Sequence, residues 1–179
     1  MITTALPNTS LANQLVCSSC NIIYEIDQQQ NFSTCCSKPL LTNYHSLDSL
    51  THLKDILAFR ENSMWRYHEL LPLFNQKNRI SIGEGWTPLL QLENVKRKYG
   101  FDDLWVKDEG RNPTGSFKAR GLSMAISKAK ELGVSSCVIP TAGNAGGAMS
   151  AYCAAAGMKA TVIMPSHTPK SFQNECKFY

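Results

Sequence analysis

A lysine stands at the predicted start of a helix, directly after a loop that contains glycine. The loop over 110–115 leads to Ser116, a good N-cap, and apolar spacing predicts a helix over 117–132. Lys118 would lie in the first turn, where the amide dipole disfavours a cation, and partial burial would add to that effect. A neutral amine is the form that attacks an aldehyde carbon, so Lys118 is a candidate for Schiff-base chemistry. A solvated surface lysine is the alternative that the residue alone leaves open.

A second loop, over 141–147, follows a predicted strand and opens a predicted helix over 145–156. The free amides at such a helix start can hold an anion, and Asn144 adds a side-chain amide. Three glycines permit a close backbone approach: Gly143, Gly146 and Gly147. A plain tight turn with glycines at positive φ is the alternative. No G-x-G-x-x-G motif is present, which disfavours a dinucleotide site.

The elements around these loops alternate between strand and helix. Strands are expected over 104–108, 136–140 and 159–164, and a further helix is expected with Thr168 as N-cap and Pro169 at its first position. This alternation predicts an α/β fold, a parallel sheet with helices on both faces. Sites in such sheets lie at the carboxyl ends of the strands, so the two loops are expected to meet there.

The rest of the chain divides into two earlier segments. We expect an arm and a ribbon-like cysteine segment over 1–44, with 1–15 frayed, then a helical connector over 45–85 and the α/β domain over 86–179. The net charge of +4 with scattered basic residues argues neither for nor against a polyanion partner. We expect no nucleic-acid partner because a basic-aromatic surface is missing. The N-terminus resembles no targeting signal and no apolar stretch is long enough for a membrane span. Seven cysteines then indicate reduced thiols and a cytoplasmic protein.

The first cysteines form one complete metal-binding knuckle and one incomplete one. Cys17 and Cys20 make a C-x₂-C pair, whereas the pair that would end at Cys36 has Ser33 in place of the first cysteine. Cys35 is a poor substitute if neighbouring side chains point apart. We therefore expect no metal, and zinc at Cys17, Cys20 and Cys36 is the alternative.

Four motifs in this order resemble threonine synthases, which belong to the fold-type II pyridoxal-phosphate enzymes. The motifs are Ile82-Gly-Glu-Gly-Trp-Thr-Pro-Leu89, Trp105-Val-Lys-Asp-Glu-Gly110, Asn112-Pro-Thr-Gly-Ser-Phe-Lys-Ala-Arg-Gly121 and Thr141-Ala-Gly-Asn-Ala-Gly-Gly-Ala148. The likeness runs from about Cys17 to the end of the chain.

The resemblance implies a role for each site residue. Lys118 would hold the cofactor, pyridoxal phosphate, covalently and then serve as general base and acid. Asn144 would bind the 3′ oxygen of the cofactor, with Gly143 beside it. The resemblance assigns the substrate to the residues that flank these groups: Ser116, Thr141, Ala142 and Ala145. It implies a lyase that converts the amino acid O-phosphohomoserine and water to threonine and phosphate, with a possible homodimer.

Several expectations qualify this implication. Many relatives carry a hydroxyl residue where this chain has Ala145, which puts the exact substrate in doubt. The larger domain of the family, with its phosphate-binding loop, lies outside the 179 residues, so we expect a fragment that retains the cofactor poorly. Arg111 and Arg120 could bind an anionic substrate, but flanking-loop charge is the simpler explanation. Two other functions stay open: a deaminase-like or β-replacing enzyme of the same fold type, and a zinc-ribbon binding module without catalysis.

Overall fold

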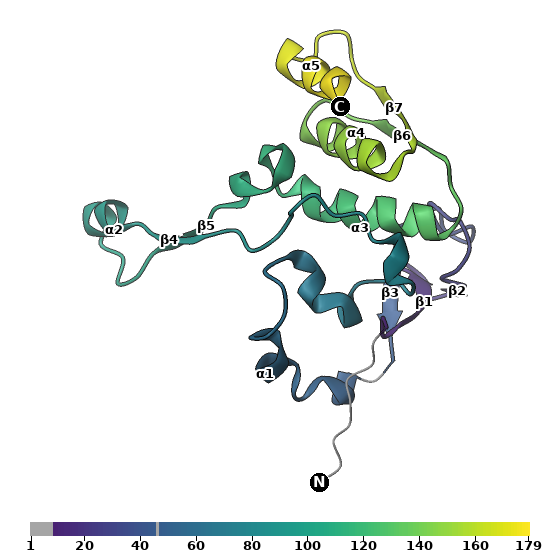
Figure 1. Cartoon of the computed structure of the whole chain (residues 1–179), viewed down its shortest axis with the longest axis horizontal. Coiled ribbons are helices and arrows are strands. Elements are labelled where there is room, and N and C mark those ends of the chain that lie inside the picture. Colours follow the sequence, from purple (N-terminus) through teal and green to yellow (C-terminus); the bar gives the residue numbers. More distant parts are fainter. Residues whose placement is uncertain (1–8, 46) are drawn as a thin grey trace. The chain divides into compact units, whose positions relative to one another are not determined.

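A computed structural model describes residues 9–45 and 47–179 of the chain (Figure 1). The chain forms two compact units, Met1–Ile80 with Met124–Ser135 and Ser81–Ser123 with Ser136–Tyr179, and the boundary between them falls within one helix. The division into segments 1–44, 45–85 and 86–179 stays a prediction. Among the described residues, no helix has the length and apolar content that a membrane span requires.

The first unit begins with a small antiparallel sheet in the order β2-β1-β3. Its strands are β1 (Ala12–Cys17), β2 (Ile23–Tyr24) and β3 (Leu40–Tyr44), with Val16 opposite both Ile23 and Leu41. The expected frayed arm over 1–15 is wrong for its described part, because Ala12 is buried in β1 and the Leu11 amide donates to the Glu69 carbonyl. Residues 1–8 lie outside the described part.

The predicted helical connector consists of short pieces. They are η1 (Leu47–Leu50), α1 (Leu53–Leu57), η2 (Met64–Leu70) and η3 (Gln76–Asn78), where η denotes a 3₁₀ helix. Met64, Trp65 and Leu73 form a buried cluster beside them. Pro72 follows η2 and cannot continue a helix, which accounts for the interruption there.

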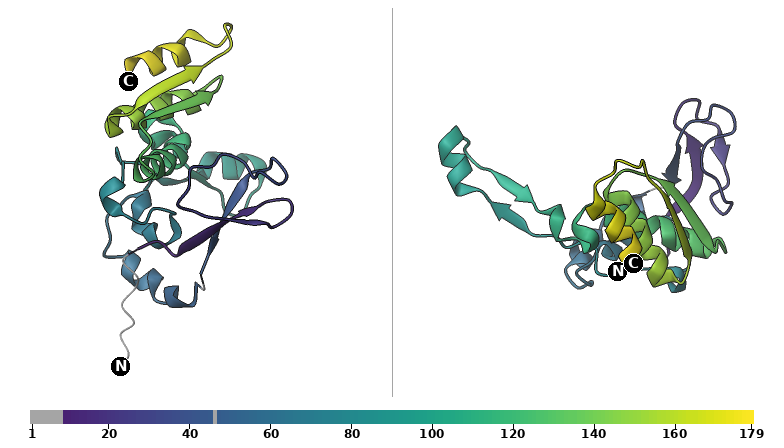
Figure 2. Two further views of the ribbon diagram at one scale, coloured as in Figure 1. Left: turned by 90° about the vertical axis from the view of Figure 1, so that its right-hand side faces the viewer. Right: turned by 90° about the horizontal axis from the view of Figure 1, so that it is seen from above.

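The second unit contains a two-stranded hairpin that the sequence assigned to a different sheet. Strand β4 (Leu89–Gln91) pairs antiparallel with β5 (Trp105–Lys107), and α2 (Glu93–Tyr99) lies at the tip of the hairpin (Figure 2). The predicted strand over 104–108 therefore exists, but its place in the parallel sheet is wrong. Strand β5 pairs instead with β4, the strand that precedes it in the sequence.

The predicted parallel pairing is confirmed for the two later strands. Strand β6 (Ser136–Pro140) pairs in parallel with β7 (Lys159–Ile163), and α4 (Asn144–Ala156) connects them and packs on both. Helix α5 (Lys170–Phe178) packs on α4, and it begins one residue after Pro169, which is the N-cap rather than the first helical residue. Helix α4 covers one face of this pair, whereas Val138 and Ile163 on the other face are 63% and 58% exposed, so the expectation of helices on both faces is confirmed only in part.

Candidate active site

Lys118 is the first residue of α3 (Lys118–Glu131), as the sequence predicts. Two short 3₁₀ turns precede it, η4 (Glu109–Arg111) and η5 (Pro113–Gly115). The buried Ser116 hydroxyl accepts a hydrogen bond from the Lys118 amide at 3.3 Å, so Ser116 caps the helix. The Lys118 side chain is half-buried, and its Nζ lies 4.6 Å from the centroid of the exposed Phe117 ring. The predicted cap and helix start are thus confirmed.

The loop before Lys118 is strained at one residue. Thr114 has a φ of 62°, a left-handed conformation that is rare for a β-branched residue. Its hydroxyl oxygen is buried and has no hydrogen-bond partner among the described residues. Backbone strain and an unpaired buried oxygen both concentrate at binding sites, where a ligand can complete the bonding.

In the second unit, the turn before Lys118 contacts the helix that the second predicted loop opens. Turn η5, which leads to Lys118, packs against α4, whose first residue is the exposed Asn144. Gly143 is the N-cap of this helix. The backbone amides in the first turn of a helix have no partner within the helix, so this end can bind an anion. The contact between η5 and α4 is consistent with the expectation that the chemistry lies where the two loops meet.

The Thr141 hydroxyl shapes the second loop. Its oxygen accepts a hydrogen bond from the Gly143 amide at 3.2 Å, which closes a tight turn directly after β6. Ala142 is exposed and Ala145 is half-buried, so neither side chain competes for the amides. The loop therefore presents backbone rather than side-chain donors, apart from Asn144.

Two glycines of this loop, Gly146 and Gly147, are needed for packing, and none of its three glycines has a positive φ. The residues with positive φ in the described chain do not include Gly143, Gly146 or Gly147. A Cβ at Gly146 would lie 2.9 Å from the Met164 methyl carbon, and one at Gly147 would overlap the Glu175 carboxylate. The alternative of a plain turn with left-handed glycines is wrong. The sequence could not show this reason because Glu175 belongs to a helix that follows two elements later.

Glu109 holds the loop before Lys118 to three neighbouring segments. Its carboxylate accepts hydrogen bonds from Arg120 Nε at 2.7 Å, from the Thr87 hydroxyl at 2.7 Å and from Asn112 Nδ2 at 2.9 Å. The Arg120 guanidinium, followed by these other donors, lowers the pKa of Glu109 to about 2 against the opposing effect of desolvation. The Arg120 guanidinium is therefore paired with Glu109. This pairing favours a structural role for Arg120 over a role in binding an anionic substrate.

We expect the stabilising effect of Glu109 to depend on pH. A carboxyl whose pKa is lowered on folding stabilises fully above its unfolded pKa of about 4.5 and loses that effect as pH falls through about 2. The difference in free energy of unfolding between the wild type and Glu109→Gln should be constant above about pH 5 and should shrink between about pH 5 and 2. Urea denaturation across this range measures it. Glu93→Gln is the control because the exposed Glu93 lies 3.8 Å from Lys96, and a surface pair of this kind contributes little.

Glu84 is a second carboxylate that fastens the site, and the sequence reasoning missed it. It is fully buried, and it accepts hydrogen bonds from the Tyr152 hydroxyl at 2.6 Å, the Ser123 hydroxyl at 2.7 Å and the Ile82 amide at 3.1 Å. Burial alone would raise the pKa of Glu84, but these hydrogen bonds outweigh it and lower the pKa. Burial and the Glu84 carboxylate raise the pKa of Tyr152. Glu84 thus joins the first motif to α3 and α4.

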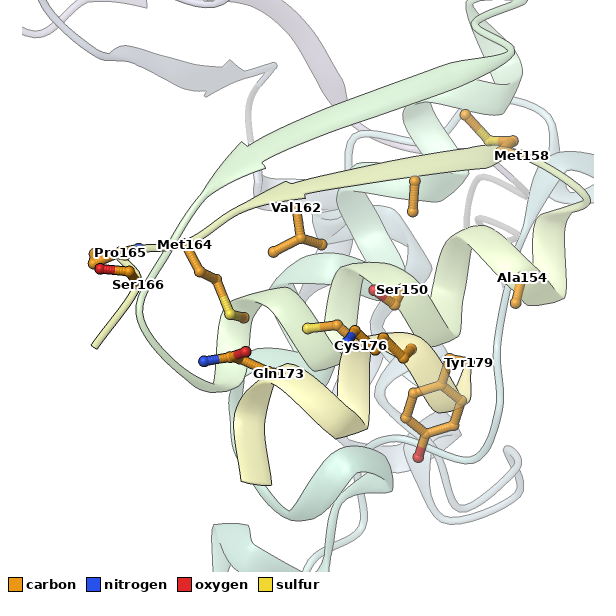
Figure 3. Close-up of a pocket in the computed structure, with 12 residues that line it drawn as sticks. Ser150, Ala154, Met158, Val162, Met164, Pro165, Ser166, Gln173, Cys176 and Tyr179 are labelled. Atoms are coloured by element: carbon orange, nitrogen blue, oxygen red, sulfur yellow. The ribbon is translucent and has the colours of Figure 1, made fainter. Parts of the chain in front are cut away.

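A cavity of about 540 Å³ in the second unit is lined mainly by residues of α4, β7 and α5. Figure 3 shows Val162 of β7, Cys176 of α5 and Ser150 of α4 around it. Ser150 is the middle residue of α4, whereas Asn144 begins that helix. None of the predicted site residues lines the cavity. We therefore place the candidate site at the two loops.

Comparison with known proteins identifies the family. The family described as "Pyridoxal-phosphate dependent enzyme" matches residues 80–179, more than half of the chain, and includes both loops. The chain belongs to this family. The predicted recognition is confirmed, and pyridoxal phosphate is confirmed as the cofactor of the family.

Similar proteins carry two different names. Over 83% of this chain, it is 35% identical to a threonine synthase of Methanocaldococcus jannaschii, and over 58% it is 44% identical to a threonine synthase of Halalkalibacterium halodurans. It is also 33% identical, over 73% of its length, to a 2-amino-4-ketopentanoate thiolase beta subunit of Acetoanaerobium sticklandii. The chain spans 37%, 30% and 29% of the lengths of these relatives.

The residues present fit pyridoxal phosphate at its aldehyde end. A half-buried lysine begins a helix, a strained loop with an unpaired buried hydroxyl precedes it, and the turn η5 of this loop packs against α4. Lys118 would hold the cofactor aldehyde carbon, and Asn144 could donate to an oxygen of the ring.

Proposed function

We propose that Lys118 is the cofactor-binding and catalytic lysine of a pyridoxal-phosphate-dependent lyase. The observation that carries the proposal is the packing of η5, the turn that precedes Lys118, against α4, at whose start Asn144 lies. The family match over residues 80–179 supports it. When bound, the cofactor supplies an electron sink for charge that develops on the substrate carbon.

The residues around the lysine bind and orient the substrate in this proposal. The backbone amides of Ala142 and Ala145 would hold the α-carboxylate of an amino acid at the start of α4. Thr141 would shape this substrate-binding loop through its hydroxyl, since its own amide donates to the Ile163 carbonyl at 3.0 Å. Lys118 Nζ would accept a proton from the α carbon and return it to a neighbouring carbon. Gly143 leaves the backbone clear beside Asn144, and Ser116 fixes the position from which Lys118 extends.

We infer that the substrate is O-phosphohomoserine, and that the products are threonine and phosphate. The likeness to threonine synthases over 83% and 58% of the chain supports this choice. We infer a role in threonine biosynthesis in the cytoplasm, with a homodimer as the working assembly. Binding nucleic acid through a zinc-ribbon module stays the least favoured alternative, since the net charge is only +4.

Another activity of the same fold type is the second candidate. The thiolase beta subunit of Acetoanaerobium sticklandii shows that a similar chain carries a different name. Ala145 favours this candidate, because it offers no side-chain hydroxyl to a polar substrate group. A deaminase-like or β-replacing reaction would use the same lysine and the same carboxylate-binding loop.

The reaction is tested by product analysis with three substrates. The chain with pyridoxal phosphate should release inorganic phosphate and form threonine from O-phosphohomoserine, and should release no ammonia from threonine or serine. Lys118→Ala should release neither product, because it removes the amine that moves the proton. Ammonia release from threonine or serine without phosphate release from O-phosphohomoserine would instead establish the deaminase-like alternative.

A further inference from the structure

Four cysteine sulfurs come together in the first unit. The Sγ atoms of Cys17, Cys20, Cys35 and Cys36 all lie within 4.8 Å of one another. The Cys20 and Cys35 sulfurs are 3.2 Å apart. The expectation that the adjacent Cys35 and Cys36 point apart, and so cannot share a site, is wrong in this structure.

The cysteines lie on two turns with the same backbone hydrogen bond. The Asn21 amide donates to the Cys17 carbonyl at 3.0 Å, and the Ser37 amide donates to the Ser33 carbonyl at 2.9 Å. Each turn ends in a left-handed residue, with φ of 61° at Asn21 and 50° at Ser37. The two turns can therefore be aligned residue by residue, with Ser33 in the place of Cys17.

This alignment shows how the second turn completes the cluster. Cys36 takes the place of Cys20, and the first cysteine of the second turn is replaced by the buried Ser33. The Cys17 thiol donates to the Ser33 hydroxyl at 3.3 Å, so Ser33 lies beside the cluster. Cys35 supplies the fourth sulfur from one residue before Cys36, and its amide donates to the Tyr24 hydroxyl at 3.1 Å, which fixes the backbone there.

We propose that Cys17, Cys20, Cys35 and Cys36 bind one structural zinc ion. Zinc in a structural site takes four ligands in a tetrahedron with Zn–S distances of about 2.3 Å, which places the sulfurs about 3.8 Å apart. That spacing lies between the 3.2 Å of Cys20 and Cys35 and the 4.8 Å limit of the cluster. Four thiolates select a soft or borderline ion over magnesium or calcium. On binding, each thiol gives up its proton to solvent and the ion takes the four sulfurs as ligands.

A bound zinc ion would stabilise the small sheet, which leaves apolar side chains exposed. Several large apolar side chains on it and its connections are at the surface: Ile23 is 59%, Phe32 62% and Leu41 57% exposed. Cys17 is buried at the end of β1, where both turns meet. A segment that buries so little apolar surface gains stability from a metal because the binding free energy contributes directly to folding.

The first test is the metal content of the wild-type chain purified under reducing conditions without added metal. We expect one zinc per chain by elemental analysis. Cobalt(II) in its place should show the visible absorption of a tetrahedral thiolate site. Absence of zinc together with free reactivity of all seven thiols, or a Cys20–Cys35 disulfide in the reduced preparation, would overturn the proposal.

The second test moves one ligand along the chain. Cys35→Ser should lower zinc affinity by at least about 100-fold, more than the loss of an outer hydrogen bond to a ligand costs. The double variant Ser33→Cys with Cys35→Ser rebuilds a second C-x₂-C pair and should restore affinity to within about 10-fold of the wild type. Cys137→Ser, outside the cluster, is the control and should bind zinc as the wild type does. Unchanged affinity in Cys35→Ser would overturn the assignment of the fourth ligand.

Discussion

Replacing Lys118 with alanine is expected to abolish the specific covalent attachment of pyridoxal phosphate to this chain. The wild-type chain, incubated with the cofactor and reduced with borohydride, should carry a pyridoxyl group on the peptide that contains Lys118. Selectivity for this amine is expected because Lys118 is half-buried at the start of α3, beside the loop that we assign to the cofactor. Peptide mapping by mass spectrometry measures the fraction of label at each lysine.

Lys130→Ala is the matched control for this experiment. Lys130 is exposed and lies in the last turn of the same helix, where a cation is favoured. Its removal should leave the label on the Lys118 peptide unchanged. Equal labelling of all exposed lysines in the wild type, or undiminished total label in Lys118→Ala, would show that position 118 has no special reactivity.

The helices that carry the site are predictable from sequence because their ends depend on local chemistry. The N-cap Ser116 lies two residues from Lys118, and Gly157 ends α4 in a left-handed conformation that glycine adopts without cost. These signals involve residues within one turn of each other. They do not require knowledge of what packs against the helix.

The sheet and the fastening residues are not predictable in the same way. An alternation of apolar residues indicates a strand but not its partner, and β5 pairs with β4 instead of the later parallel strands. Tyr152 follows Glu84 by 68 residues, so their hydrogen bond appears only when α4 is placed. The same limit applies to Gly147 near the start of α4, because the side chain that leaves no space for a Cβ there, Glu175, belongs to α5.

The cysteines illustrate a different limit. Adjacent side chains point apart in a strand, where successive Cβ atoms alternate between faces. Cys35 and Cys36 lie in a turn that ends in the left-handed Ser37, so the alternation does not apply to them. Secondary structure has to be known before a pair of neighbouring residues can be excluded from a common site.

Tyr152→Phe is expected to lower the free energy of unfolding by about 1.5–3 kcal/mol, the range for a hydrogen bond to a charged group. The substitution keeps the ring in place and removes the hydroxyl that donates to the Glu84 carboxylate at 2.6 Å. Since Glu84 is fully buried and its pKa is lowered, its charge would then have one donor fewer and no water to replace it. Urea denaturation at neutral pH measures the loss.

The control for Tyr152→Phe is Tyr99→Phe at the end of α2, where the tyrosine is 64% exposed. This change should alter the free energy of unfolding by less than about 0.5 kcal/mol, as surface substitutions generally do. A combined Tyr152→Phe and Ser123→Ala variant should lose more or less than the sum of the two single losses, because both hydroxyls donate to the same carboxylate. Strict additivity, or a loss for Tyr152→Phe as small as that for Tyr99→Phe, would mean that Glu84 does not depend on these donors for its buried charge.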